Sequence, residues 1–288
     1  MKTLTAASIV AALALLTTAC AAQTQADNPV ATVAPIPVSA QSGRIEISAE
    51  IHRSGDVDAR TAIIVIGGSG VGERSDTSQA IPLFLNSSQD VVIFDRRGHG
   101  QSGGEAIRPG TENSAWLIPA HADDVIALAA ALRQRGYDHV GLVGSSMGGW
   151  IAVSATARSQ SVDFLVSIVG GAVSVQVSDA FDVLTDQGMA RADAAREAAA
   201  LETTLGYDPA EDLSALSQPA LFVLAEADTS NPSRLDVRNI EMLQADGVDI
   251  RYILVPNADH NFVNTITGEP ELGWVSEMHA FIELTADQ

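Results

Sequence analysis

The stretch Gly144-Ser145-Ser146-Met147-Gly148 decides the fold, because it matches the G-x-S-x-G turn that joins a buried strand to a helix. Residues 137–143 before it predict a short buried strand, and residues 147–158 after it are rich in Ala, Ile and Val and predict a helix. Its glycines suit a turn in which the two backbones approach too closely for a Cβ atom. The five-residue pattern also arises by chance, so this context carries the argument. Ser146 is therefore the candidate nucleophile.

Continuous apolar runs predict six strands buried on both faces of a parallel sheet: 61–66, 90–94, 139–143, 164–168, 220–224 and 250–255. Helical stretches lie between most of these strands and after the last one: 116–135, 147–158, 232–245 and 271–283. This alternation predicts right-handed crossovers and an α/β domain whose mostly parallel sheet is covered on both faces. Residues 44–52 alternate in polarity and predict an antiparallel edge strand.

Residues 172–217 interrupt this rhythm with an Ala-, Asp- and Glu-rich stretch that holds no strand candidate. We expect a short helical cap, inserted above the carboxyl ends of the strands, where open α/β sheets bind ligands. The alternative is a connector that never contacts a substrate. If the segment is a cap, its apolar side chains are the candidates to face the site: Phe181, Val183, Leu184, Met189, Leu201, Leu205 and Tyr207.

The first residues predict an export signal over 1–19: a positive start at Lys2, an apolar run over 4–18, and small residues before Cys20, the only cysteine. The ending resembles a bacterial lipoprotein signal, in which Cys20 becomes the lipid-modified first residue, although Thr17 replaces the more usual Leu. The alternative is ordinary cleavage nearby with an incidental cysteine. Either reading predicts an exported protein, periplasmic or held on the outer membrane, facing the periplasm or the cell exterior.

Residues 20–42 are mostly Ala, Gln, Thr, Pro and Ser, so they bury too little apolar surface to offset the entropy of ordering. We expect a flexible tether there, followed by one domain over 43–288. The formal net charge of −20 makes nucleic acid a poor partner and disfavours adsorption on anionic lipid. Membrane residence would therefore depend on an anchor at Cys20. The sequence says nothing about oligomeric state.

A serine hydroxyl becomes nucleophilic when an imidazole takes its proton and a carboxylate orients that imidazole. His260 follows the strand that ends at residue 255, and Asp228 follows the strand that ends at residue 224, so both emerge at the same sheet edge as Ser146. Glu226 and Asp259 are rival acids. The remaining histidines are assigned structural roles: His52, His99, His121, His139 and His279.

A serine-centred reaction also needs two amide donors for the developing oxyanion. Met147, directly after the nucleophile, supplies the first. The glycine-rich loop 67–72 follows the first buried strand and supplies the second, with Ser69 as the first choice and Gly68 next. A phosphate-binding loop is disfavoured because the chain has no G-x-x-x-x-G-K-[ST] pattern and no lysine nearby.

With these residues in place, the chain resembles α/β-hydrolase-fold serine esterases from about Arg44 to its last residue. The resemblance rests on five segments in order: 67–74 (GGSGVGER), 94–102 (FDRRGHGQS), 144–149 (GSSMGG), the Asp228 loop and the His260 loop. Segment 95–102 is similar to the D-x-R-G-x-G-x-S turn of this superfamily, which implies that Asp95 and the arginines hold the loop beside the site.

Among such proteins the chain resembles bacterial esterases and peptidase-like hydrolases whose early loop reads H-G-S-G-P before an acid and an arginine. Here Gly67 replaces that histidine, Val71 replaces the proline, and Ser145 stands where relatives often have His. The departures bear on substrate preference and leave the oxyanion amides available.

The resemblance implies attack by Ser146 on an acyl carbonyl, with His260 as base and Asp228 as its orienting acid. A small carboxylic ester is the expected substrate, while acyl transfer, thioester hydrolysis and peptide cleavage would use the same three residues. No metal is implied because the histidines lack ligand spacing, and no cofactor motif is present. A surface lipoprotein that binds a ligand without turnover is the alternative from another class.

Overall fold

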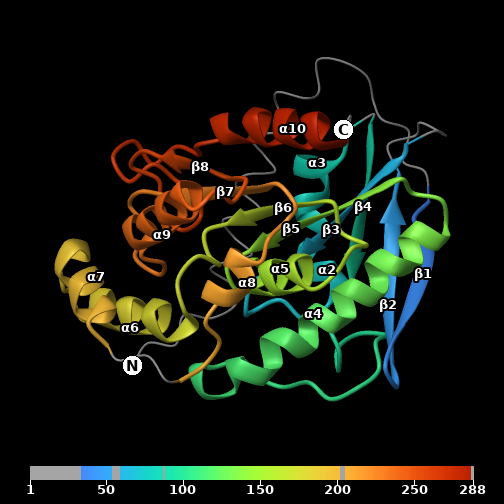
Figure 1. Ribbon diagram of the computed structural model, residues 1–288, viewed down its shortest axis with the longest axis horizontal. Helices are drawn as coiled ribbons and strands as arrows, with labels where there is room; N and C mark the ends of the chain where they lie inside the picture. Colours follow the sequence, from blue (N-terminus) through green and yellow to red (C-terminus); the bar gives the residue numbers. More distant parts are fainter. Residues whose placement is uncertain (1–33, 54–58, 87, 202–204, 287–288) are drawn as a thin grey trace.

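The computed structural model describes residues 34–53, 59–86, 88–201 and 205–286; the predicted signal over 1–19 and Cys20 lie outside these residues. The described chain contains an eight-stranded sheet with the order β1-β2-β4-β3-β5-β6-β7-β8 (Figure 1). Its strands are β1 Ile36–Ser42, β2 Ile45–His52, β3 Thr61–Ile66, β4 Gln89–Phe94, β5 His139–Ser145, β6 Phe164–Ile168, β7 Ala220–Ala225 and β8 Ile250–Val255.

All neighbours from β4 to β8 pair in parallel, and β1 and β2 pair antiparallel at one side. Chain order reverses at the centre, because β4 lies on one side of β3 and β5 on the other. A reversal of this kind opens a crevice at the carboxyl ends of the strands. The expected α/β domain with a mostly parallel sheet is confirmed, and β3, β6 and β8 have the predicted bounds.

The predicted tether is wrong for its last seven residues, because Ile36–Ser42 form β1. This strand pairs along its whole length with β2 and buries Val38 and Ala40, while its other side chains face outward or are half-buried. As a result β2 is antiparallel, as predicted, but is an inner strand, and β1 takes the sheet edge. Pro37 is tolerated there because an edge strand needs only half of its backbone donors.

Helices cover both faces of the sheet, as alternate residues of β3 make clear. Ile64 and Ile66 pack in one cluster with α4 Thr111–Gln134, α5 Met147–Ala157 and α9 Ser233–Ala245. Ile63 and Val65 pack in a second cluster with α3 Ile81–Phe84 and α10 Gly273–Ala286. Figure 1 shows α10 and α3 on the opposite side of the sheet from α4 and α5. Burial on both faces is why the strands read as continuous apolar runs.

The longest described helix, α4, is apolar enough to pass for a membrane span by length and composition. Half of its most apolar window is buried within the molecule, however, and most of its buried apolar side chains belong to the same core cluster as α5. We therefore describe α4 as a core helix of the domain. Its first turn lies beside the cap, where the hydroxyl of Thr111 donates to Asp179.

The predicted cap is helical, with α6 Val175–Asp186, α7 Arg191–Ala199 and the short α8 Ala210–Ser214. A small core of its own joins α6 to α7, and it includes Val177, Phe181 and Ala194. The apolar residues expected to face the site divide: Phe181 and Tyr207 are buried, whereas Val183, Leu201 and Leu205 are exposed. Two further short helices, α2 Arg74–Thr77 and the 3-10 helix Ser78–Ala80, follow the glycine-rich loop.

Candidate active site

Ser146 lies at the sharp turn between β5 and α5 with φ 52° and ψ −120°, a backbone conformation that serine rarely adopts. Its amide donates to the carbonyl of Ile168 at 2.8 Å, which anchors the turn to β6. A Cβ atom on Gly144 would lie 2.1 Å from the Gly148 carbonyl oxygen, and one on Gly148 would lie 2.1 Å from that of Ile66. Both glycines are therefore required for strand and helix to meet at this turn.

Asp228 and His260 come together from loops that follow β7 and β8. His260 Nδ1 lies 2.7 Å from Asp228 Oδ2. The other carboxylate oxygen, Oδ1, accepts the amides of Ser230 at 2.7 Å and Asn231 at 2.9 Å. Because a carboxylate oxygen only accepts, this geometry assigns the ring proton to Nδ1 and leaves Nε2 as the proton acceptor.

The rival acids have other partners. Glu226 forms an ion pair with Arg234 and accepts the amide of Asn257 at 3.3 Å. Asp259 Oδ1 accepts the amides of Asn261 and Val263, both at 2.9 Å, and so shapes the loop that carries the histidine. Of the three acids, Asp228 alone is hydrogen bonded to the His260 ring among the described residues.

The environment of His260 raises the pKa of its ring above the ordinary value. Burial acts in the opposite direction, but the negative charge and hydrogen bond of Asp228 outweigh it, with further help from Asp182 and Asp259. Asp182 belongs to α6, so a residue of the cap contributes to the electrostatics of the imidazole. A more basic imidazole is a better proton acceptor once it is deprotonated.

Ser146, Asp228 and His260 thus lie at the carboxyl ends of β5, β7 and β8, as their sequence positions predict. Among the described residues, the acid and the histidine are hydrogen bonded and no hydrogen bond links Ser146 Oγ to the ring. Contacts of a nucleophile with its base are often long before substrate binds.

The glycine-rich loop lies directly against the nucleophile. A Cβ atom on Gly68 would lie 3.3 Å from the Ser146 Cβ, so this glycine leaves room for backbone beside the hydroxyl. Met147 is the first residue of α5, and amides of a first helical turn have no acceptor within the helix. The next loop residue, Ser69, is exposed, and Gly68 is half-buried. Gly68 of the loop and Met147 of α5 therefore both adjoin Ser146, and the predicted roles of the Met147 and Ser69 amides remain predictions.

Arg96 holds the glycine-rich loop in place. Its guanidinium donates to the carbonyl of Gly67, and at 3.0 Å to that of Gly68. Fixing these two carbonyls restricts the directions in which the following amides point. Burial lowers the pKa of Arg96 to about 10 against the opposing charge of Asp76, so the group remains a cation at neutral pH.

The neighbouring Asp95 fixes the start of the 95–102 turn, as the resemblance implies. Its side chain accepts the Arg74 amide at 2.8 Å and the Gln101 amide at 2.9 Å, and it pairs with the Arg74 guanidinium. The hydroxyl of Ser102 closes the turn by donating to the Asp95 carbonyl at 2.6 Å.

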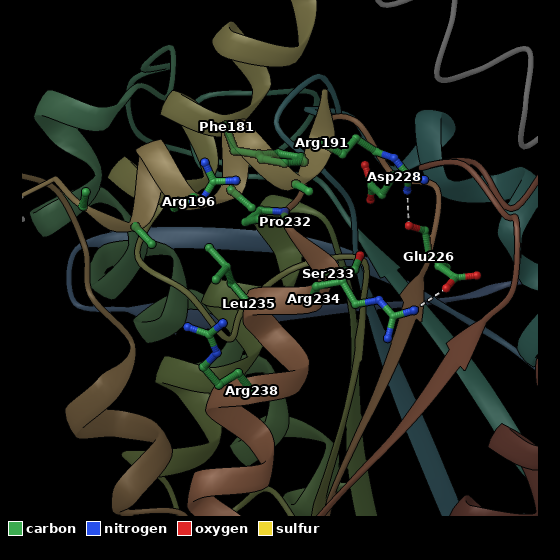
Figure 2. A pocket seen from close by; sticks show the side chains of 14 residues that line it. Phe181, Arg191, Arg196, Glu226, Asp228, Pro232, Ser233, Arg234, Leu235 and Arg238 are labelled. Atoms are coloured by element: carbon green, nitrogen blue, oxygen red, sulfur yellow. Dashed lines mark hydrogen bonds and ion pairs between the residues drawn. The ribbon is translucent and has the colours of Figure 1, made fainter. Parts of the chain in front are cut away.

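The cap is attached to the loop that carries Asp228. Thr185 of α6 donates to the carbonyl of Thr229 at 2.5 Å, and Arg191 at the start of α7 donates to the carbonyl of Glu226. A cavity of about 680 Å³ lies between the cap and α9, and Phe181, Leu235 and Asp228 are among the residues that line it. Figure 2 shows Arg191 and Arg234 both reaching Glu226 at one end of this cavity.

Sequence reasoning missed one residue that shapes the site. A Cβ atom on Gly170, just after β6, would lie 2.7 Å from the Ser146 carbonyl oxygen, so a larger residue would displace the turn. The pair Gly170-Gly171 after an apolar run was the signal that could have revealed this. No sequence pattern predicts the contacts of Arg96 with the loop carbonyls, because these contacts depend on tertiary packing. The described residues contain no cluster of three or more side chains suited to a metal ion.

Comparisons with known proteins agree with this architecture. Residues 63–270 match the model of the alpha/beta hydrolase family. An esterase from Pyrococcus furiosus superposes with a TM-score of 0.67 at 15% identity, over 89% of this chain and 92% of the esterase.

Two peptidases have the same fold. The acylaminoacyl peptidase of Pyrococcus horikoshii gives a TM-score of 0.64 at 14% identity, over 91% of this chain and 43% of that one. The proline iminopeptidase of Mycobacterium smegmatis gives a TM-score of 0.56 at 14% identity, over 87% of this chain and 98% of the peptidase. Curated proteins show no significant sequence match to the chain. The family match over most of the domain and the fold of these neighbours lead to one conclusion: the chain is a member of the alpha/beta hydrolase family.

Proposed function

We propose that this hydrolase is a serine esterase that cleaves small carboxylic esters through an acyl-enzyme on Ser146. The observation that carries the proposal is the 2.7 Å contact between His260 Nδ1 and Asp228 Oδ2, at the same sheet edge as a serine on a strained turn. A carboxylate and an imidazole paired in this way are the means by which a serine hydroxyl is activated.

In the proposed first step, Ser146 Oγ attacks the ester carbonyl carbon while its proton passes to His260 Nε2. The carbonyl oxygen becomes an oxyanion, stabilised by the amides of Met147 and Ser69. The C–O bond to the alcohol then breaks, and the leaving alkoxide takes the proton from His260. Water next attacks the acyl-enzyme and gives a proton to His260, and collapse returns that proton to Ser146 as the carboxylic acid leaves.

Hydrolysis of p-nitrophenyl esters from acetate to long acyl chains tests the proposal with the purified protein. Release of p-nitrophenol that depends on Ser146 is the expected result, and the chain-length profile measures the space available to the acyl group. Failure on every ester would contradict esterase activity and shift attention to thioester, peptide or acyl-transfer substrates. Failure on these substrates too would favour a ligand-binding lipoprotein.

The rate should rise with pH as the histidine loses its proton. Since the pKa of His260 is raised, kcat/KM should reach half its maximum above the ordinary histidine value of about 6.5. Asp182→Asn removes one of the charges responsible and should move this midpoint to lower pH. Profiles of kcat/KM against pH for both proteins measure the difference. A midpoint that stays in place in the variant would show that Asp182 does not influence the base.

We further propose export as a lipoprotein anchored at Cys20, which is supported by the signal-like sequence before this only cysteine. Firm anchoring needs several acyl chains on one residue, and Cys20→Ser removes the residue that would carry them. The variant should then move from the membrane fraction to the soluble periplasm. Fractionation of cells expressing both forms measures this. Equal membrane partitioning of the two would contradict lipidation.

A further inference from the structure

A second cavity, of about 320 Å³, lies against the glycine-rich loop. Residues 69–72 line one side of it, so the loop that carries the proposed oxyanion donor also forms a wall of this cavity. The rest of the lining includes three arginines and two histidines, and we call it the basic cavity: Arg96, Arg97, His99, Arg108 and His121.

The charge of the basic cavity is opposite to that of the chain. The chain carries a formal net charge of −20, yet the residues that line this cavity include no Asp or Glu. Arg96 is buried and remains a cation at neutral pH, because its pKa is about 10. An anion entering the cavity would therefore meet arginine donors and no competing carboxylate in the lining.

Two of the arginines are held rigidly by neighbours. Arg97 donates to both carboxylate oxygens of Asp124, each at 2.7 Å, and Arg96 donates to the loop carbonyls. Arg108 is exposed at the edge of the cavity, and within the described part of the chain its side chain has no carboxylate partner. It is therefore the arginine best able to close on a bound anion.

His121 on α4 supplies the most specific observation. The residue is 5% exposed, and no described residue forms a hydrogen bond with its buried Nδ1. Its nearest acid, Asp124, is 3.9 Å away and already satisfied by Arg97. Burial and the charges of Arg96, Arg97 and His99 lower the pKa of His121 to about 3. The neutral ring can donate one hydrogen bond and accept another. A buried polar group without a partner is costly, and the ring that carries this one lines the basic cavity.

We propose that the basic cavity binds a carboxylate or phosphate group of the substrate, so that the preferred esters are anionic. The proposal rests on the esterase function above and specifies its substrate. Ser69 and Gly70 line the cavity, and Gly68 lies against Ser146. A substrate whose ester carbonyl reaches the serine would extend its anionic end past this loop. Arginine can donate two parallel hydrogen bonds to two oxygens of a carboxylate or of a phosphate, which suits both groups.

A matched pair of esters tests the proposal: the mono-p-nitrophenyl ester of glutaric acid and p-nitrophenyl valerate, which have the same number of acyl carbons. The wild-type protein should have the higher kcat/KM on the glutarate ester. Arg108→Gln should lower the glutarate-to-valerate ratio of kcat/KM about tenfold, equivalent to about 1.4 kcal/mol. Arg251→Gln, which removes an exposed arginine of β8 outside the cavity, should keep the wild-type ratio.

Binding to Ser146→Ala, measured by calorimetry with glutarate and inorganic phosphate, separates this proposal from the esterase function. If these anions bind and adding Arg108→Gln to the Ser146→Ala protein abolishes their binding, the basic cavity is an anion site even if no ester is hydrolysed. Ester hydrolysis with an unchanged glutarate-to-valerate ratio of kcat/KM and no anion binding would contradict the proposal that the basic cavity binds the substrate. The esterase function would remain supported. His121→Leu should also weaken anion binding. Arg108→Gln is the better test, because the Arg108 side chain is exposed and can be replaced without disturbing the core.

Phosphate also distinguishes a substrate group from a free anion. Competitive inhibition against the glutarate ester, with little effect on the valerate ester, would support a subsite for the substrate. If phosphate changes the turnover of the valerate ester without competing with the glutarate ester, the basic cavity is a separate effector site. That result would contradict the proposal that it binds a group of the substrate.

Discussion

Replacing Ser146 with alanine is expected to reduce ester hydrolysis by about six orders of magnitude in kcat, since the variant has no oxygen to form an acyl-enzyme. Alanine and serine are equally strained at the φ of 52°, so the fold should be retained. Initial rates on p-nitrophenyl acetate measure the loss, and thermal melting of both proteins checks the fold.

Ser145→Ala is the matched control for this prediction. Ser145 precedes the nucleophile at the end of β5, and the same change there should leave the rate within about tenfold. A Ser146→Ala protein that melts normally and keeps more than about a tenth of the rate would contradict the assignment of the nucleophile.

Asp228→Asn is expected to lower kcat by about four orders of magnitude while retaining the fold. Asp228 Oδ1 accepts two backbone amides, so the oxygen of asparagine should remain there and its NH₂ group should face His260 Nδ1. The ring must then accept through Nδ1 and carry its proton on Nε2, where it cannot take the proton of Ser146. Rates on the same ester measure the loss.

Glu226→Gln is the control, because Glu226 has the same charge two residues earlier but pairs with Arg234. Its rate should stay within about tenfold of the wild type. Loss of activity in this variant, together with near-normal turnover in Asp228→Asn, would transfer the orienting role to Glu226.

The sheet could be predicted because its strands are buried on both faces. β3, β6 and β8 are continuous apolar runs, and their bounds coincide with those runs. The composition of residues 36–42 does not predict β1, because only Val38 and Ala40 are buried and polar residues lie between and after them. The period of two over residues 36–40 was the available signal. α2 and α3 have four residues each, too few to show a helical period.

The site was predictable to the extent that each residue follows a strand. Parallel strands end at one edge, so Ser146, Asp228 and His260 could be assigned to that edge from sequence. The partners of Arg96 could not be derived, because its buried guanidinium contacts a loop 28 and 29 residues earlier. The sequence predicts a structural role for His121, and only the folded structure shows that its ring lines a cavity beside Arg96 and Arg97 and that its Nδ1 has no hydrogen-bond partner among the described residues.

Covalent labelling with a fluorophosphonate tests the central claim most directly, because the reagent reacts with an activated serine and remains attached. Trypsin should release the labelled peptide 136–158, and fragmentation should place the phosphonyl group on Ser146. Labelling should be lost in Ser146→Ala and strongly slowed in Asp228→Asn. A label on another residue, or none in the folded wild-type protein, would contradict the proposal that Ser146 is an activated nucleophile.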